Sequence, residues 1–193
     1  MDKRVCVFCA SSNKVDKSHF EATAILARDL ARHNYTTIYG GGSAGLMGHL
    51  ANTILEEKGV VVGILPRFME KVEWGHKGLT DLILVEDMHE RKKLLIKDVD
   101  AVVALPGGCG TLEELMEVIT LKRLGKFTKP VVILNLNGFY DPLVEMLHRM
   151  IEGKFMRPEH ANIWQVVTKP EEILAAIENA PEWSADKINI ATV

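Results

Sequence analysis

The feature that most constrains the fold is a repeated alternation of short apolar runs with amphipathic stretches. Runs such as VCVFCA at 5–10, VVVGIL at 60–65 and AVVAL at 101–105 are apolar at nearly every position. Strands without a polar face are buried on both sides, as in a parallel sheet covered by helices. The sequence therefore predicts an α/β, Rossmann-like, doubly wound fold with a mainly parallel sheet flanked by helices.

Further strand-like runs and helix starts complete this alternation. The other expected strands are TTIY at 36–39, LILV at 82–85, PVVILNL at 130–136 and WQVV at 164–167. Four expected helices begin near Ser18, Gly45, Met88 and Thr111. A fifth covers about 139–152, and a last helix ends near Ala180. Capping boxes mark four starts: Ser18 with Glu21, Asp87 with Glu90, Thr111 with Glu114, and Thr168 with Glu171.

Length and composition predict one domain. The chain has 193 residues, 47% of them hydrophobic, and no long low-complexity tract. We expect a single nucleotide-binding or hydrolase domain over 1–180 and a loosely attached tail over 181–193. The longest irregular stretch, about 66–80, interrupts the alternation and is a candidate active-site loop.

Charge and cysteine content indicate the class of partner and the compartment. The formal net charge is −3 with both signs interspersed, so we expect small-molecule or protein partners and neither nucleic acid nor membrane. No apolar run reaches the roughly 18 residues of a membrane span. Three cysteines, at 6, 9 and 109, fit a reducing compartment, and we expect a cytoplasmic protein. Cys6 and Cys9 lie within a strand, where their offset sends them to opposite faces as core residues.

Ligands of open α/β sheets bind beyond the carboxyl ends of the strands, here the segments at 11–13, 40–45, 66–67, 86–92 and 106–111. Two of these are glycine loops that open a helix. In GGGSAG, glycines at 40, 42 and 45 match G-x-G-x-x-G, which is typical of phosphate binding, although a tight turn is the alternative. An NAD site is not favoured, because the loop follows the second strand and the next strand ends in Arg67.

The second loop, PGGCGT at 106–111, repeats the arrangement. Thr111 could cap the helix or donate its hydroxyl to a phosphate oxygen. The loop lacks the lysine of a Walker motif, so it predicts a site for a monophosphate and no triphosphate hydrolysis. Cys109, at a helix start, is either an activated thiol or a lining residue.

Carboxylates and cations follow this loop closely. Glu114 could close a capping box or reach the sugar that a bound phosphate carries. Glu117 shares its helix face, whereas Glu113 is turned by about 100°. Arg91 and Lys92 flank an apolar stripe, so at least one should lie against the sheet edge, the alternative being a solvated basic face. The histidines at 49, 76 and 89 lack ligand spacing, and no metal or cofactor is predicted.

PGGCGTLEE, together with MHERK at 88–92 and GGGSAGLMG at 40–48, resembles the LONELY GUY family. The members are phosphoribohydrolases that act on cytokinin riboside 5′-monophosphates and are often mislabelled as lysine decarboxylases. The resemblance runs from about Val5 to Thr168. It implies hydrolysis of the N-glycosidic bond of AMP or N6-substituted AMP to the free base and ribose 5-phosphate, in a Rossmann-like homodimer.

The resemblance also implies the site residues. Arg91 and Glu114 would carry catalysis. Residues that would contact the nucleotide are Gly41, Gly42, Gly45, Glu73, Met88, Lys92, Gly107, Gly108, Cys109, Gly110, Thr111, Leu112, Glu113 and Thr120. Cys109 stands where plant members usually have tyrosine, and Leu121 where they have tryptophan, so the accepted base, AMP or an N6-prenylated analogue, stays open.

Glycosidic cleavage passes through an oxocarbenium-like sugar that a carboxylate can stabilise while it orients the attacking water. Glu114 is the carboxylate that the sequence offers for this role. The alternative class is a non-catalytic module that binds a nucleotide or a nucleotide-derived cofactor, similar in fold to molybdenum-cofactor carriers.

Overall fold

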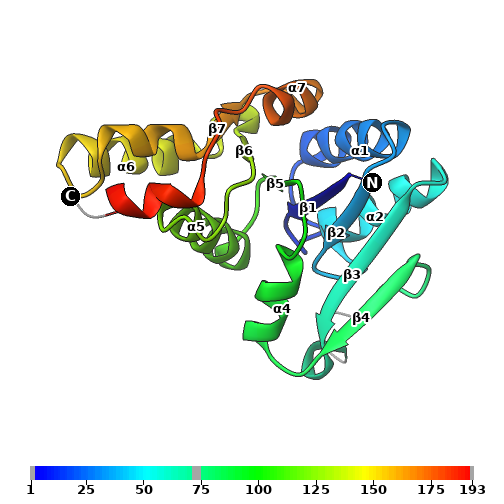
Figure 1. Cartoon of the computed structure of the whole chain (residues 1–193). Coiled ribbons are helices and arrows are strands. Elements are labelled where there is room, and N and C mark those ends of the chain that lie inside the picture. Colours follow the sequence, from blue (N-terminus) through cyan, green and yellow to red (C-terminus); the bar gives the residue numbers. More distant parts are fainter. Residues whose placement is uncertain (1–2, 71–74, 192–193) are drawn as a thin grey trace.

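The computed structural model describes residues 3–70 and 75–191. They form a single domain around a seven-stranded sheet in which every pair of neighbouring strands is parallel, in the order β4-β3-β2-β1-β5-β6-β7. All the expected strands are present (Figure 1): β1 (Arg4–Phe8), β2 (Thr36–Tyr39), β3 (Val60–Pro66), β4 (Asp81–Val85), β5 (Ala101–Ala104), β6 (Val131–Leu134) and β7 (Gln165–Val167).

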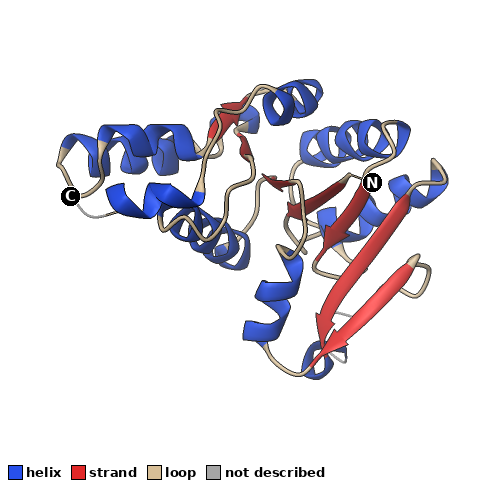
Figure 2. Cartoon of the chain, viewed as in Figure 1, coloured by secondary structure: helices blue, strands red, loops and turns tan. Residues whose placement is uncertain are grey.

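Helices cover both faces of the sheet, as Figure 2 shows in blue around the red strands. One hydrophobic cluster packs the sheet against α1 (Lys17–Arg32), α2 (Gly45–Glu56) and α7 (Ile173–Glu178). The other packs it against α4 (Met88–Leu95), α5 (Cys109–Arg123) and α6 (Asp141–Glu152). Cys6 and Cys9 belong to different clusters, which confirms that they face opposite sides. The predicted three-layer α/β fold is therefore confirmed.

The position of β1 creates a crevice. β1 pairs with β2 on one side and with β5 on the other, so the chain reverses its direction of travel through the sheet there. At such a switch point the connections leaving the two strands diverge to opposite faces, and the gap between them accepts ligands. Segments 9–16 and 105–108, which follow β1 and β5, border this gap.

Two of the predicted capping boxes form differently. Asp16, and not Ser18, caps α1, because its carboxylate accepts hydrogen bonds from both the backbone nitrogen and the hydroxyl of Ser18. Near α7 the bonding carboxylate is that of Glu172, and not Glu171: it accepts from the backbone nitrogen of Thr168 at 3.1 Å.

At α4 the prediction is confirmed for one half, since Asp87 accepts from the backbone nitrogen of Glu90 at 2.8 Å. The Glu90 carboxylate accepts from the backbone nitrogen of Glu86 at 2.9 Å, and not from that of Asp87. At α5 it is wrong. This helix begins at Cys109 after Gly108, so Thr111 lies inside the first turn and is buried. The Thr111 side chain fills the space where Gly107 would otherwise carry a Cβ. Glycine in the loop thus lets the helix begin two residues earlier.

The segment after Pro181 is packed, contrary to the expected loose tail. Trp183 is 6% exposed, belongs to the core cluster on the α5 side, and donates its indole N–H to the Lys122 carbonyl at 2.6 Å. A short 3-10 helix, Ala185–Ile190, continues from it. An aromatic ring that finds both a pocket and a hydrogen-bond acceptor ties a terminus down. Among the described residues, no helix has the length and apolar character needed to cross a membrane.

Candidate active site

A cleft of about 260 Å³ opens at the switch point of the sheet. Its floor is the end of β1, and its walls come from α5, from α4 and from the loop after β2. The lining residues are Val7, Phe8, Cys9, Ala10, Ser11, Gly40, Met47, Arg91, Gly108, Cys109, Gly110, Thr111 and Glu114. Two segments that are far apart in sequence, 40–47 and 108–114, therefore meet over β1.

The start of α5 offers an anion site to this cleft. Gly108 caps the helix without a side chain, and the first hydrogen bond of the turn runs from Leu112 N to the Gly108 carbonyl at 3.1 Å. The preceding N–H groups of a helix, here at 109–111, have no partner within it and carry the positive end of the dipole. A Cβ at Gly108 or Gly110 would meet open space, so both backbones are open to a ligand.

Glu114 lies one turn further along α5 and lines the same cleft. Burial raises the pKa of both Cys6 and Cys9, and the negative charge of Glu114 raises each further. The Glu114 carboxylate therefore lies close enough to the end of β1, which forms the floor of the cleft, to act on it electrostatically. A carboxylate placed one helical turn, about 5 Å, beyond a phosphate site can reach the sugar that the phosphate carries.

Arg91 enters the cleft from α4 and is only 6% exposed. Its Nε donates to the Ile64 carbonyl at 3.2 Å and its Nη2 to the Gly40 carbonyl at 3.0 Å. A Cβ at Gly40 would collide with this guanidinium, so a larger residue there would displace Arg91 from its present position. The expectation that Arg91 or Lys92 lies against the sheet edge is confirmed for Arg91, and the planar fork explains why this cation is an arginine.

The first glycine loop is bonded within the protein at three consecutive carbonyls. Gly40 accepts from Arg91, Gly41 accepts from His76 N at 3.1 Å, and Gly42 accepts from the hydroxyl of Tyr39 at 3.1 Å. Gly42 also pairs with Gly75 in an isolated bridge.

The helix that follows the first loop is anchored as well. Gly45 N donates to Asn13 Oδ1 at 2.8 Å, and Met47 N donates to the Ala10 carbonyl at 3.2 Å. Gly45 has a φ of +60°, and a Cβ there would collide with the backbone of Ser11. The first N–H groups of α2 are thus bonded to the segment after β1, whereas the first N–H groups of α5 point into the cleft.

The other two acids near the start of α5, Glu113 and Glu117, both form ion pairs with Lys92. Its Nζ lies 2.6 Å from Glu113 and 2.9 Å from Glu117, and its side chain is 17% exposed. The hydrogen bonds that Lys92 donates, to Glu113 first and to Glu117 second, raise the pKa of Lys92 to about 12. Glu117 lies on the same helix face as Glu114, as the helix geometry predicts, and both line a small pocket with Lys92. In the structure Glu117 joins Glu113 in bridging α5 to α4, and Glu114 alone of the three lines the cleft.

All three cysteines are free thiols: Cys6 and Cys9 are buried and Cys109 is exposed at the mouth of the cleft. No group of three His, Cys, Asp or Glu side chains within 3–70 and 75–191 is arranged to hold a metal ion.

Known proteins resemble the chain in sequence. A family model described as "Possible lysine decarboxylase" matches residues 47–177. Cytokinin riboside 5′-monophosphate phosphoribohydrolase LOG5 of Arabidopsis thaliana is 39% identical over 176 residues, which is 91% of this chain and 77% of the relative. LOG3 of the same plant is 38% identical and covers 91% of this chain and 82% of its own. The chain belongs to the LONELY GUY family.

Solved structures share the fold of this LONELY GUY protein. A structural genomics target aligns with a TM-score of 0.70 at 28% identity, covering 91% of this chain and 98% of that one. The molybdenum cofactor carrier protein of Chlamydomonas reinhardtii aligns with a TM-score of 0.71, over 93% and 98% of the two chains, at 19% identity. At that identity the likeness concerns the fold and not the ligand.

The structure divides the residues implied by the LONELY GUY resemblance into two groups. Those that line the cleft are Arg91, Gly108, Cys109, Gly110, Thr111 and Glu114. Described residues that do not line it are Gly41, Gly42, Gly45, Met88, Lys92, Gly107, Leu112, Glu113 and Thr120. Glu73 lies outside the described residues. The first group surrounds one volume, whereas most of the second supports its walls.

The set implied by the resemblance lacks seven residues that line the cleft: Val7, Phe8, Cys9, Ala10, Ser11, Gly40 and Met47. Gly40 opens the first glycine motif, and its role is to make room for Arg91. Ser11 belongs to the segment 11–13, which the sequence already marks as a ligand-binding position because it follows a strand. Met47 has no sequence signal, because an apolar residue on an amphipathic helix is more often part of the core.

Proposed function

We propose that the protein hydrolyses the N-glycosidic bond of a nucleoside 5′-monophosphate, AMP or N6-substituted AMP, to the free base and ribose 5-phosphate. One observation carries the proposal: the open N-terminus of α5 and the carboxylate of Glu114 lie on the same helix, one turn apart, in one cleft that also holds the buried Arg91. An anion site next to a carboxylate suits a substrate that is a phosphate at one end and a cationic sugar in the transition state.

In this scheme the 5′-phosphate accepts hydrogen bonds from the backbone of Cys109, Gly110 and Thr111. These N–H groups belong to a rigid helix, so binding fixes the ribose relative to α5. Lys92 and Met88, which the family also implies, do not line the cleft and would support its walls through Glu113 and Arg91.

Glu114 would face the anomeric carbon. Its charge stabilises the positive character that develops on the ribose as the bond to the base breaks, and its oxygen can take a proton from the attacking water. Arg91 is held at Gly40 and Ile64, so its position does not depend on substrate. Its charge would stabilise the electrons that move onto the departing base.

Incubation with AMP, isopentenyl-AMP, GMP and CMP, followed by chromatography, tests this function. We expect free adenine or its N6-substituted form from the first two, with ribose 5-phosphate in equal amount. Intact nucleotide that co-elutes with the protein would instead identify a binding module. A Cys109→Tyr variant, which restores the residue usual in plant members, shows whether this position sets the preference between the two adenine nucleotides.

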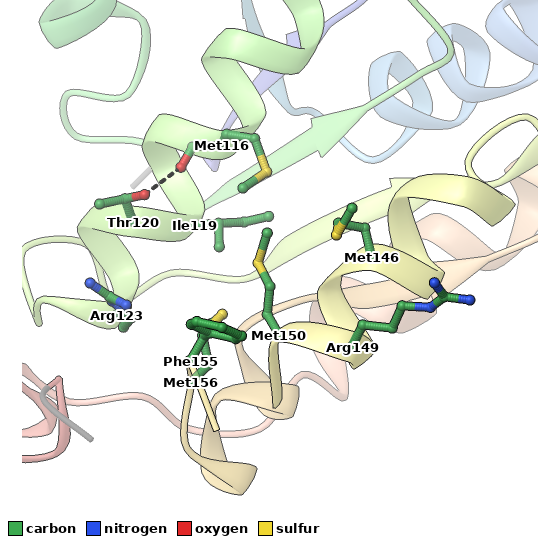
Figure 3. Close-up of a pocket in the computed structure, with 9 residues that line it drawn as sticks. All are labelled: Met116, Ile119, Thr120, Arg123, Met146, Arg149, Met150, Phe155 and Met156. Atoms are coloured by element: carbon green, nitrogen blue, oxygen red, sulfur yellow. Dashed lines mark hydrogen bonds between the residues drawn. The ribbon is translucent and has the colours of Figure 1, made fainter. Parts of the chain in front are cut away.

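We further infer a homodimer that forms through the outer face of α5 and α6. Figure 3 shows side chains from both helices around a pocket of about 510 Å³, lined by Met116, Ile119, Thr120, Arg123, Met146, Arg149, Met150, Phe155 and Met156. Phe155 is 75% exposed and Met146 is 52% exposed. Clustered apolar side chains on an open face are typical of an interface. Thr120 lies here, away from the cleft of its own chain.

Light scattering tests the homodimer. Wild-type protein should have twice the mass of the chain, and Met146→Glu should lower this to a single chain because it places a charge in the contact. Val60→Glu is the matched control, since Val60 is also an exposed apolar residue, at the start of β3, and should leave the dimer intact. A single-chain mass for the wild type at micromolar concentration contradicts the inference.

Three free thiols support a cytoplasmic location as part of the same proposal. Fractionation of cells that produce the tagged chain should place it with the soluble cytoplasmic proteins, and recovery from a secreted fraction would contradict this.

A further inference from the structure

Tyr140 lies directly beneath the second glycine loop. It stands just before α6, is 1% exposed, and its hydroxyl donates to the Leu105 carbonyl at 2.8 Å. Leu105 is the last residue before PGGCG, and its N–H is fixed too, by the Phe8 carbonyl at 2.9 Å. Both polar backbone groups that precede the loop are therefore held, one by β1 and one by Tyr140.

Tyr140 is itself positioned by the strand that follows the loop in the sheet. Its backbone N–H donates to Asn135 Oδ1 at 2.7 Å, and the amide nitrogen of Asn135 donates to Asp141 at 2.7 Å. Asn135 N bonds the Val167 carbonyl at 2.8 Å. A continuous series of hydrogen bonds thus runs from β7 through Asn135 and Tyr140 to Leu105. Asn135 and Tyr140 are buried although Asp141 is exposed, and hydrogen bonds between buried groups of this kind hold the chain rigidly.

From Leu105 only Pro106, Gly107 and Gly108 separate this fixed carbonyl from the first turn of α5. Proline restricts its own φ, and Gly107 is packed against the Thr111 side chain. A shift at Leu105 would therefore be transmitted to the N–H groups at 109–111.

We propose that Tyr140 is a positioning residue for the phosphate subsite: by holding the Leu105 carbonyl it sets the direction of the N–H groups at the start of α5. This rests on the proposed function, since it assigns the 5′-phosphate to that helix terminus. Tyr140 touches no reacting atom, so its removal weakens binding of the phosphate and leaves the bond-breaking step nearly unchanged.

The hydroxyl keeps its proton throughout the working range. Burial, and secondarily the neighbouring Cys9, raises the pKa of Tyr140 well above its usual value. Tyr140 thus stays a donor at any pH at which the enzyme is folded. The effect of removing the hydroxyl must then be independent of pH.

Tyr140→Phe tests the proposal, with Tyr35→Phe as the matched control. Tyr35 is also buried, but it lies before β2, at the opposite end of the strand, with Lys3 over its ring. We expect Tyr140→Phe to raise both KM for AMP and Ki for ribose 5-phosphate about fivefold to tenfold, to change kcat less than about twofold, and to do so equally from pH 6 to pH 9. Tyr35→Phe should change none of these values.

An unchanged Ki in folded Tyr140→Phe overturns the inference, as does a fall in kcat with Ki unaltered. If Tyr140→Phe does not fold, Asn135→Ala, which releases the Tyr140 N–H, should raise the same Ki, and an unchanged Ki in that variant is equally fatal. Failure of wild-type protein to cleave AMP would refute the proposed function instead. Binding of ribose 5-phosphate, measured by calorimetry on both proteins, then still decides the role of Tyr140.

Discussion

The two glycine loops look alike in sequence and do different work. Both follow a buried strand and open a helix, at 40–45 and at 107–110. In the first loop three consecutive carbonyls and the N–H of Gly45 are bonded to other parts of the protein. In the second, Gly107 packs against the Thr111 side chain, but Gly108 and Gly110 face open space and the helix terminus points into the cleft. A glycine motif after a strand therefore indicates that something approaches the backbone closely. Whether that is a ligand or another part of the protein is decided by the groups that the loop contacts in the structure.

The largest expected effect comes from Glu114, on the helix α5 that follows the second glycine loop. Glu114→Gln keeps the size and the helix but removes the charge that stabilises the oxocarbenium-like sugar. We expect kcat for AMP to fall at least about 100-fold with KM little changed. Glu117→Gln is the control, because Glu117 pairs with Lys92 outside the cleft and should retain most activity. Near-wild-type turnover by Glu114→Gln would remove the catalytic role from this helix.

Substitution of the two glycine loops should affect different properties. Gly45→Ala puts a Cβ against the Ser11 backbone at a φ of +60°. We expect it to lower the free energy of unfolding by about 2 to 4 kcal/mol, measured by denaturant titration. A stable Gly45→Ala protein would show that the first loop is not constrained as described.

Gly110→Ala should weaken substrate binding and leave stability unchanged. A Cβ there meets open space and the backbone is helical, so stability should be retained. The methyl group would occupy the phosphate position, and we expect KM for AMP to rise about tenfold, equivalent to about 1.4 kcal/mol of binding. Unchanged steady-state kinetics would place the phosphate elsewhere.

A smaller effect is expected from Asn13, which caps Gly45 from outside its helix. Asn13→Ala should cost about 1 kcal/mol of unfolding free energy, the usual value of a lost cap. Ser12→Ala is the control, since its hydroxyl bonds only the exposed Lys14 N. Equal stabilities of the two variants would mean that water replaces the Asn13 cap.

The smallest expected effect is on the pH dependence of stability, and it comes from His76, which bonds to the first loop. His76 donates its backbone N–H to Gly41, and its Nδ1 accepts from Gly78 N at 3.1 Å, so the neutral ring is required. Burial lowers the pKa of His76. The unfolded chain therefore takes up the proton first, and stability present above about pH 6.5 is lost as pH falls through the lowered folded value. His76→Asn should lose less stability than wild type between pH 7.5 and 5, and parallel curves would contradict this.

Sequence periodicity was sufficient for the sheet and its helices, because strands buried on both faces leave a continuous apolar signal. Helix starts were less predictable. Thr111 fits a capping box, but Gly107 and Gly108 allow α5 to begin at Cys109, and only packing shows that Thr111 fills the space beside Gly107. Trp183 was misjudged for a similar reason, since its acceptor on Lys122 is far away in sequence.

For the site, the family resemblance implied Arg91 and Glu114, and both line the cleft. The residue pattern alone left Arg91 and Lys92 as alternatives. The pattern did not show that Glu113 and Glu117 pair with Lys92, because the position of Lys92 in space decides which acids it reaches. The commitment of the first loop to internal partners was also invisible, since those partners, from Asn13 to Arg91, are dispersed along the chain.

The most direct test of the central claim is the identity of the products that the wild-type protein forms from AMP. Because a phosphate held at α5 places the ribose beside Glu114, cleavage must fall between the sugar and the base. The account predicts adenine and ribose 5-phosphate in equal amounts, with no adenosine and no inorganic phosphate, at a rate proportional to enzyme. Recovery of intact AMP under the same conditions, or of adenosine with phosphate, would contradict it.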